Sequence, residues 1–181
     1  DVPVAAVLDT GLFDFDRAHS HPMWAKELYG FADHVPETEE YGVTSHVFRA
    51  RRPFDPQKVH DLLNGPLPGV IRAKGHFWIA TRPDWVAEFS LAGALSSVAP
   101  LGTWWAAVPR DRWPGHDGAR DYLARHWQEP WGDRRQELVF IGSGINWPDL
   151  SAALDAALCA EVTPGGADPF PVWRRAEVAA A

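Results

Sequence analysis

Cysteine, methionine and surplus basic charge are scarce in this chain of 181 residues. Cys159 is the only cysteine, so the chain alone builds neither a disulfide framework nor a thiolate metal cluster. Its formal net charge of −7 argues against nucleic-acid binding, which depends on a basic surface. No apolar run approaches the ~20 residues of a membrane span. We therefore expect a cytoplasmic protein that contacts neither nucleic acid nor membrane.

The common catalytic motifs are also missing. No phosphate-binding G-x-x-x-x-G-K-[ST] loop is present, because the Gly142-Ser143-Gly144 run is followed by no lysine. The patterns G-x-G-x-x-G, H-E-x-x-H and G-x-S-x-G are absent as well. Cys159 lies among small residues near the end of an amphipathic segment, where an inert thiol is expected. The sequence therefore predicts no catalytic constellation.

Periodicity predicts the order β-α-β-β-β-α-β-α after an N-terminal helical arm. Val43 to Ala50 alternates like a strand, and the Asp55-Pro56 pair begins a helix that Gly65 ends. Further extended runs are expected at 70–81, 85–90, 94–99 and 138–142, with a continuation of the 94–99 run towards Trp104-Trp105 left open. Further helices are expected at 117–128 and 146–158. This order predicts an α+β fold: an antiparallel-rich sheet of about four to five strands with helices on one face, close to the split β-α-β class.

The chain divides into three expected parts. Residues 1–42 form an arm, with helical spacing from Asp14 to Gly30. Residues 43–173 form the globular domain, and the alanine-rich residues 174–181 are expected to be a disordered tail.

Several blocks of residues follow one another in a characteristic order. They are Glu39-Glu40-Tyr41-Gly42, Arg51-Arg52-Pro53-Phe54, Arg72-Ala73-Lys74-Gly75-His76-Phe77-Trp78 and the run 132–142, with 9–14 upstream and 168–171 downstream. Together they resemble the C-terminal domain of the CobW family of P-loop GTPases, which are metal chaperones related to cobalamin synthesis proteins. The sequence departs from the family at Asp55, where many members have a histidine, and this removes one candidate metal ligand.

The resemblance implies that the chain is the accessory half of a larger protein and that the arm follows an absent GTPase domain. GTP, Mg²⁺ and the family's metal site belong to that domain, in the same or a separate polypeptide. The expected role is a non-catalytic regulatory and interaction domain that contacts the GTPase domain and a client metalloprotein, in zinc homeostasis. Two alternatives stay open: a domain that itself carries metal, and a free-standing small-molecule binding domain with a pocket lined by strand tryptophans.

Basic residues gather at the predicted strand ends of an otherwise acidic chain. Arginine forks suit carboxylates and phosphates, so the set predicts a surface facing the GTPase domain, its nucleotide or a client. The set is Arg51, Arg52, Arg72, Lys74, Arg134 and Arg135, with Arg49 nearby. The alternative is structural, with these cations paired to Glu39, Glu40, Asp133 and Glu137.

His19-Ser20-His21 is the local metal candidate. Imidazoles at i and i+2 on an extended segment reach a common ion, with His34 or an acidic residue completing the shell. Zinc is the expected metal. Of the ten tryptophans, those in strands are expected in the core, and Trp24 and Trp173 are the candidates for a partner interface.

Overall fold

The computed structural model describes residues 3, 10–11, 14–20 and 42–174, in two compact units that divide after residue 40. The first unit contains α1 (Phe15–His19), where the Asp14 carboxylate accepts the N–H of Arg17 at 3.0 Å. The rest of the helical arm predicted up to Gly30, and the tail from residue 175 onward, lie outside the described residues.

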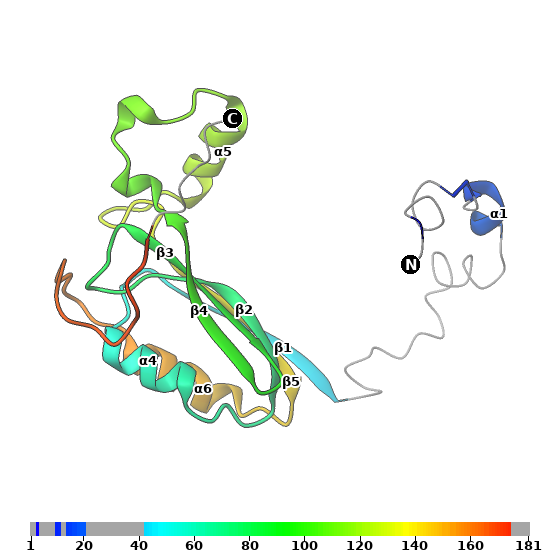
Figure 1. Cartoon of the computed structure of the whole chain (residues 1–181), viewed down its shortest axis with the longest axis horizontal. Helices are drawn as coiled ribbons and strands as arrows, with labels where there is room; N and C mark the ends of the chain where they lie inside the picture. Colours follow the sequence, from blue (N-terminus) through cyan, green and yellow to red (C-terminus); the bar gives the residue numbers. More distant parts are fainter. Residues whose placement is uncertain (1–2, 4–9, 12–13, 21–41, 175–181) are drawn as a thin grey trace. The chain divides into compact units, whose positions relative to one another are not determined.

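The second unit contains a five-stranded antiparallel sheet with the spatial order β1-β5-β2-β3-β4 (Figure 1). The last strand of the chain inserts between the first two, as in a split β-α-β arrangement. The strands are β1 (Val43–Ala50), β2 (Val70–Phe77), β3 (Trp85–Ala92), β4 (Leu95–Thr103) and β5 (Gln136–Ser143). The predicted α+β fold with an antiparallel sheet is confirmed.

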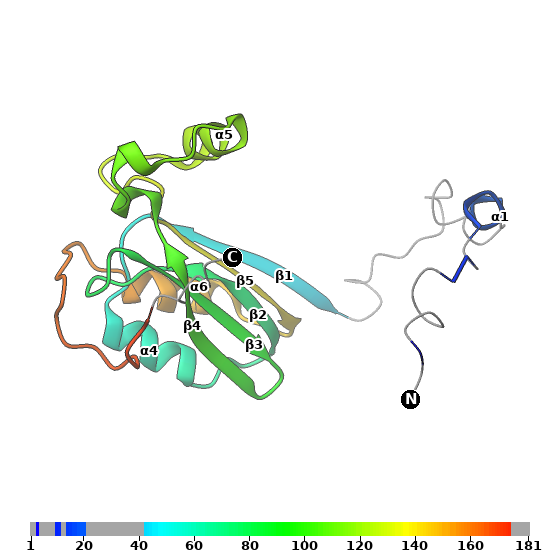
Figure 2. The ribbon, with the colours of Figure 1, turned by 45° about the horizontal axis from the view of Figure 1, so that its top comes forward.

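Two helices cover one face of this sheet: α4 (Pro56–Asn64) and α6 (Trp147–Ala157) (Figures 1 and 2). Each begins as the sequence indicates, with a side-chain cap and a proline in the first turn. Asp55 accepts the N–H of Lys58 at 2.9 Å, and Asn146 accepts that of Asp149 at 3.3 Å. The side chains fully buried between helices and sheet are Val59, Phe77, Phe89, Leu138, Phe140 and Leu154.

Residues 104–135 leave the sheet between β4 and β5 and form the α5 excursion. It holds two short 3₁₀ helices, Trp105–Ala107 and Arg110–Arg112, followed by α5 (Asp117–His126). In both ribbon views the excursion lies beyond the ends of the strands, away from α4 and α6 (Figures 1 and 2). The α5 excursion therefore extends the domain beyond one end of the sheet.

Residues 159–174 form the C-terminal strap, which closes the core beside α4. Arg82 donates to both carboxylate oxygens of Asp168, at 2.9 and 2.6 Å, and to the carbonyls of Phe170 and Pro171. Its guanidinium carbon also lies 4.3 Å from the ring centre of Trp173. We expected Trp173 at an interface, but it is 8% exposed and belongs to the core, while Trp24 lies outside the described residues.

Across the described segments, no helix combines the length and apolarity needed to cross a lipid bilayer.

Candidate functional site

The face of the sheet opposite α4 and α6, the open face, carries no helix of the described residues (Figure 2). Leu138 and Phe140 point into the core, so Glu137, Val139 and Ile141 of β5 point to the open face. Residues directly opposite in antiparallel strands share a face, which places Val47 and Lys74 on either side of Val139. The open face thus combines half-buried apolar residues with cations.

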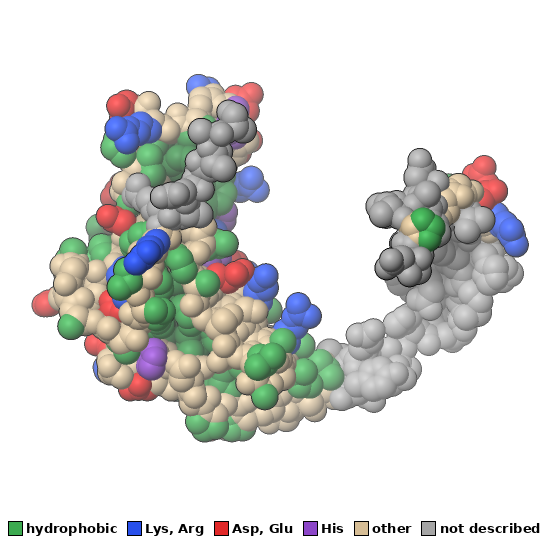
Figure 3. Space-filling model, viewed as in Figure 1, with side chains coloured by type: hydrophobic (Ala, Val, Ile, Leu, Met, Phe, Trp, Pro, Cys, Tyr) green, Lys and Arg blue, Asp and Glu red, His purple; other side chains and the backbone are tan. Residues whose placement is uncertain are grey.

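Among the described residues, the open face carries three exposed basic side chains: Arg72 and Lys74, which are neighbours on the same face of β2, and Arg49 on β1. Arg72 lies opposite Ile141 and is exposed. Lys74 is exposed as well, with its Nζ 3.3 Å from a carboxylate oxygen of Glu88. On the side of the molecule seen in Figure 3, Lys and Arg side chains lie at several places rather than in one patch.

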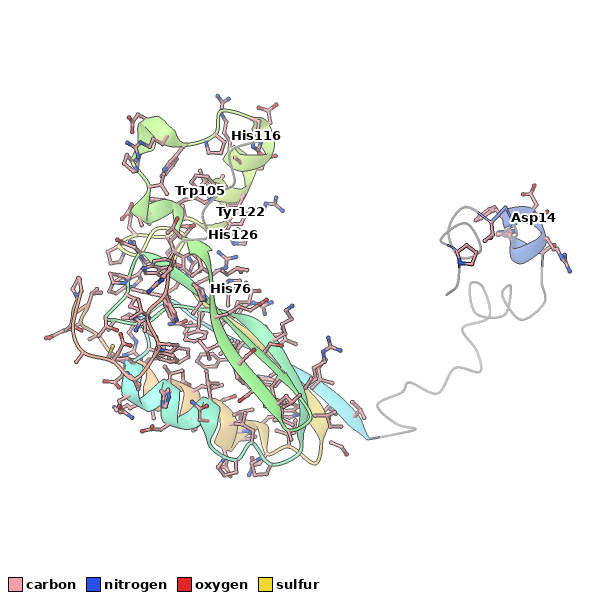
Figure 4. All side chains as sticks on the ribbon, viewed as in Figure 1. Asp14, His76, Trp105, His116, Tyr122 and His126 are labelled. Carbon is pink, nitrogen blue, oxygen red and sulfur yellow. The ribbon has the colours of Figure 1, made fainter. Side chains whose placement is uncertain are left out.

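At the α5 end of the open face, five polar side chains converge. We call them the His76 cluster: His76, Tyr122, His126, Arg135 and Glu137. Arg135 donates to Glu137 and to the Tyr122 hydroxyl, at 3.2 Å each. Figure 4 shows His76 on the sheet with His126 and Tyr122 following it toward α5. The cluster therefore joins the excursion to the open face.

His76 is held in the neutral form. Burial, followed by the charge of Arg135, lowers the pKa of this imidazole. Its Nε2 atom is buried, 3.8 Å from Glu137, and no hydrogen-bond partner for it lies among the described residues. Burial opposes ionisation of Glu137, but hydrogen bonds from Arg135 and Arg49 outweigh it and lower the pKa of that carboxyl. At neutral pH the cluster thus contains an ionised carboxylate beside a neutral histidine.

The described residues contain no group of three or more His, Cys, Asp or Glu placed to hold a metal ion. His19 lies in α1, where its ring stacks on Phe15 with 5.7 Å between centroids. Its predicted co-ligands His21 and His34 lie outside the described residues. Metal binding by His19 and His21 stays a prediction.

Three of the six predicted basic site residues donate hydrogen bonds to acceptors within the domain. Arg51 donates to the carbonyl of His126 at 2.8 Å, and more weakly to those of Gly132 and Arg134, so it ties the α5 excursion to β1. Arg134 donates to the Pro83 carbonyl at 2.7 Å. Arg135 binds within the His76 cluster.

Arg52, Arg72 and Lys74 are exposed, and they are the members of the predicted set that a partner can reach. Of the structural partners considered for the set, Glu137 pairs with Arg49 and Arg135. Asp133 is buried and accepts backbone N–H groups of Trp105 and Ala106. Glu39 and Glu40 lie outside the described residues.

The convergence in the His76 cluster is not predicted by the sequence, in which its histidines look scattered. Only β2–β5 pairing and the path of the excursion bring His76 and His126 together. The one usable signal is the position of Arg135 and Glu137 at the start of a buried strand. Burial, followed by the charge of Asp55, raises the pKa of the Cys159 thiol, which favours the protonated form.

Two cavities are present beside α4. One, of about 230 Å³, is mainly apolar and lies between the ends of α4 and α6, with Leu62, Val70 and Leu150 in its wall. The other, of about 160 Å³, lies between α4, β4 and the C-terminal strap. Neither is lined by a tryptophan, and the strand-end residues Trp78 and Trp104 are buried by packing. Neither of these two cavities of the described residues is the tryptophan-lined pocket that the small-molecule alternative requires.

The family model described as "Cobalamin synthesis protein cobW C-terminal domain" matches residues 43–158, from the first residue of β1 to just past α6. With its split antiparallel sheet, the chain belongs to the CobW C-terminal domain family.

Particular relatives carry zinc-related names. The chain is 43% identical over 144 residues to the "Zinc-regulated GTPase metalloprotein activator 1" of Dictyostelium discoideum, covering 78% of this chain and 30% of that protein. It is 37% identical over 115 residues to "Zinc chaperone Rv0106" of Mycobacterium tuberculosis, covering 63% of this chain and 29% of that one. The chain thus spans about a third or less of the length of these relatives.

Among solved structures, the chain is similar to the Zn(II)-bound YjiA GTPase from E. coli, with a TM-score of 0.46 and 19% identity. The match covers 70% of this chain and 33% of that one.

Proposed function

We propose that this chain is the non-catalytic regulatory and protein-interaction domain of a CobW-like, GTP-dependent metallochaperone in zinc homeostasis. Family membership over residues 43–158 supports the assignment, as do the zinc-related names of two relatives. Those relatives are about three times longer than the matched segment, which leaves room for a separate GTPase domain. GTP and Mg²⁺ bind to that domain, and this one contacts it and a client metalloprotein.

The observation that carries the proposal is the open face of the sheet. Half-buried Val47, Val139 and Ile141 lie there without a covering helix of the described residues, flanked by exposed Arg72 and Lys74. Covering such a strip with a second protein surface removes apolar side chains from water, which favours binding. The GTPase domain is the occupant that we assign to it, and rearrangement of that domain after GTP hydrolysis changes how much of the strip is covered.

A reconstitution experiment tests this assignment. The remainder of the Dictyostelium relative, without its matching segment, is titrated with this chain by calorimetry. Val139→Glu places a carboxylate in the apolar strip and should weaken binding by roughly tenfold or more, about 1.4 kcal/mol. Ala152→Glu, on an exposed position of α6, is the matched control and should leave binding unchanged.

The isolated chain should neither bind nor hydrolyse GTP. Measured turnover by the purified chain would show that it is catalytic. Equal binding by wild-type chain and Val139→Glu would show that another surface contacts the GTPase domain.

Metal carriage by the arm is the second candidate, favoured by the His19-Ser20-His21 spacing alone. Zinc titration of the wild-type chain and of a His19→Ala/His21→Ala variant separates it from the first. Loss of one bound zinc in the double variant supports it, whereas equal binding by the two proteins rejects these ligands.

A further inference from the structure

Strand β1 is an edge of the sheet, and within the described part of the chain it pairs only with β5. All eight of its residues are in register with β5, without a shift. The outer side of such a strand presents a row of unpaired backbone N–H and C=O groups, which template pairing with another strand.

The two edges of the sheet differ in how they are protected. At the opposite edge, β4 contains Pro100 and Gly102, and its pairing with β3 shifts register between Val86 and Ala87. Proline, glycine and bulges interrupt an edge ladder and discourage strand addition. β1 contains no proline, glycine or lysine, and its one charged side chain, Arg49, binds Glu137 of the same sheet. Among the described residues, β1 is therefore the edge that lacks these protective features.

We propose that β1 is the dimerisation edge of this domain, with β1 of a second copy adding antiparallel around a two-fold axis through Val47. The two sheets then form one continuous sheet of twice the width, and the two free backbone ladders satisfy each other. A two-fold pair of this kind is self-complementary, because each contact between two different residues of the two copies occurs twice, once in each direction.

The side chains of β1 select this register. Val47 and Ser45 lie on the open face. The open faces of the two copies lie on the same side of the joined sheet only when the two-fold axis passes through a residue rather than between two residues. With the axis at Val47, the two Val47 side chains contact each other and each Ser45 lies opposite Arg49 of the second copy. With the axis at His46, two imidazoles oppose each other and Val47 meets the hydroxyl of Ser45. The Val47 axis places apolar with apolar and sets no like charges opposite.

The net charge of the chain opposes this association at long range. Two copies that each carry a net charge of −7 repel each other, and salt screens this repulsion. The backbone hydrogen bonds at the edge do not depend on salt concentration. The dimer should therefore tighten as ionic strength rises, the opposite of an interface held by ion pairs.

Opposite charges at position 45 test the register. Ser45 is exposed, so both Ser45→Lys and Ser45→Glu should fold, which thermal unfolding checks. Lys at 45 opposes Arg49 of the second copy and should weaken the dimer roughly fivefold to tenfold, since two symmetric pairs change; Glu should strengthen it by a similar factor. Leu101→Lys, at a 62% exposed residue of β4, is the control and should leave the dissociation constant unchanged.

Sedimentation equilibrium of the purified chain gives the outcome. Dimerisation with opposite shifts for the two Ser45 variants supports the proposal. A monomer at all concentrations overturns it, including the case in which β1 accepts a strand from a different protein. Equal effects of Lys and Glu overturn the Val47 register, and loss of the dimer in Leu101→Lys overturns the choice of edge.

Discussion

Removing the carboxylate of Asp168 should release the C-terminal strap from the core. This side chain is 3% exposed and accepts from two guanidinium nitrogens of Arg82, the hydroxyl of Thr81 and the backbone N–H of Phe170. Breaking one partner of a buried, hydrogen-bonded ion pair costs about 3–5 kcal/mol. Arg82 keeps two carbonyl acceptors and its stacking on Trp173, so we expect the lower end, about 3 kcal/mol, for Asp168→Ala.

The same contribution should depend on pH. Burial opposes ionisation of Asp168, yet hydrogen bonds from Arg82, Thr81 and Phe170 outweigh it and lower the pKa of the carboxyl below its ordinary 3.8. A group with a lowered folded-state pKa stabilises the protein fully above its unfolded value, and that stability is lost as the pH falls through the folded value. The penalty of Asp168→Asn should therefore be full near pH 7 and shrink below the ordinary value.

Urea unfolding measures both effects, followed by tryptophan fluorescence. The matched control is Asp155→Asn, at an exposed position of α6. This substitution should change the free energy of unfolding by less than about 0.5 kcal/mol. A penalty for Asp168→Ala as small as that of the control would refute the role of the ion pair. A penalty for Asp168→Asn that persists unchanged in acid would refute its electrostatic origin.

Three further substitutions test other parts of the domain. Gly75→Ala should cost more than about 3 kcal/mol in urea unfolding, because its Cβ would collide with the backbone of β5, whereas Gly102→Ala, with open space, should cost under about 1 kcal/mol. The pKa of His76, followed by NMR, should lie below 6.5 and rise in Arg135→Gln. Because the folded protein disfavours the charged imidazole, the contribution of His76 to the free energy of unfolding falls as the pH drops. Arg51→Ala should increase proteolytic cleavage within the α5 excursion before global unfolding, and unchanged cleavage would contradict its role as a tie.

Local patterns were sufficient for most elements of the domain. Alternation predicted the bounds of β1 without error. The Asp55-Pro56 pair predicted the start of α4, and the Asn146 cap predicted that of α6, each within a residue. The errors fell where pairing rather than pattern sets the length. The run predicted to reach residue 81 ends as β2 at Phe77. β4 extends to Thr103, in line with the continuation towards Trp104-Trp105 that the sequence left open, because it pairs with β3 as far as Trp85.

The candidate site was less accessible to sequence reasoning. The basic residues were found, but their division into internal ties and exposed cations depends on which acceptors the fold places within reach. Arg51 looks no different from Arg52 in the sequence, yet one binds three carbonyls and the other is exposed. Gly75 likewise gives no sign in the sequence of what lies beside it, and only the fold places it so close to the backbone of β5 that an added Cβ would collide with Glu137 and Leu138.

By itself, the sequence determined the class of fold, the family and the absence of the family's phosphate-binding loop from this chain, because these depend on periodicity, caps and ordered blocks of residues. Only the tertiary structure decided which face of the sheet carries no helix of the described residues, which strands form its edges and that Trp173 belongs to the core. Those properties depend on contacts between residues far apart in the chain. Arg82 and Asp168, for example, are 86 positions apart and meet only when the strap closes over the folded sheet.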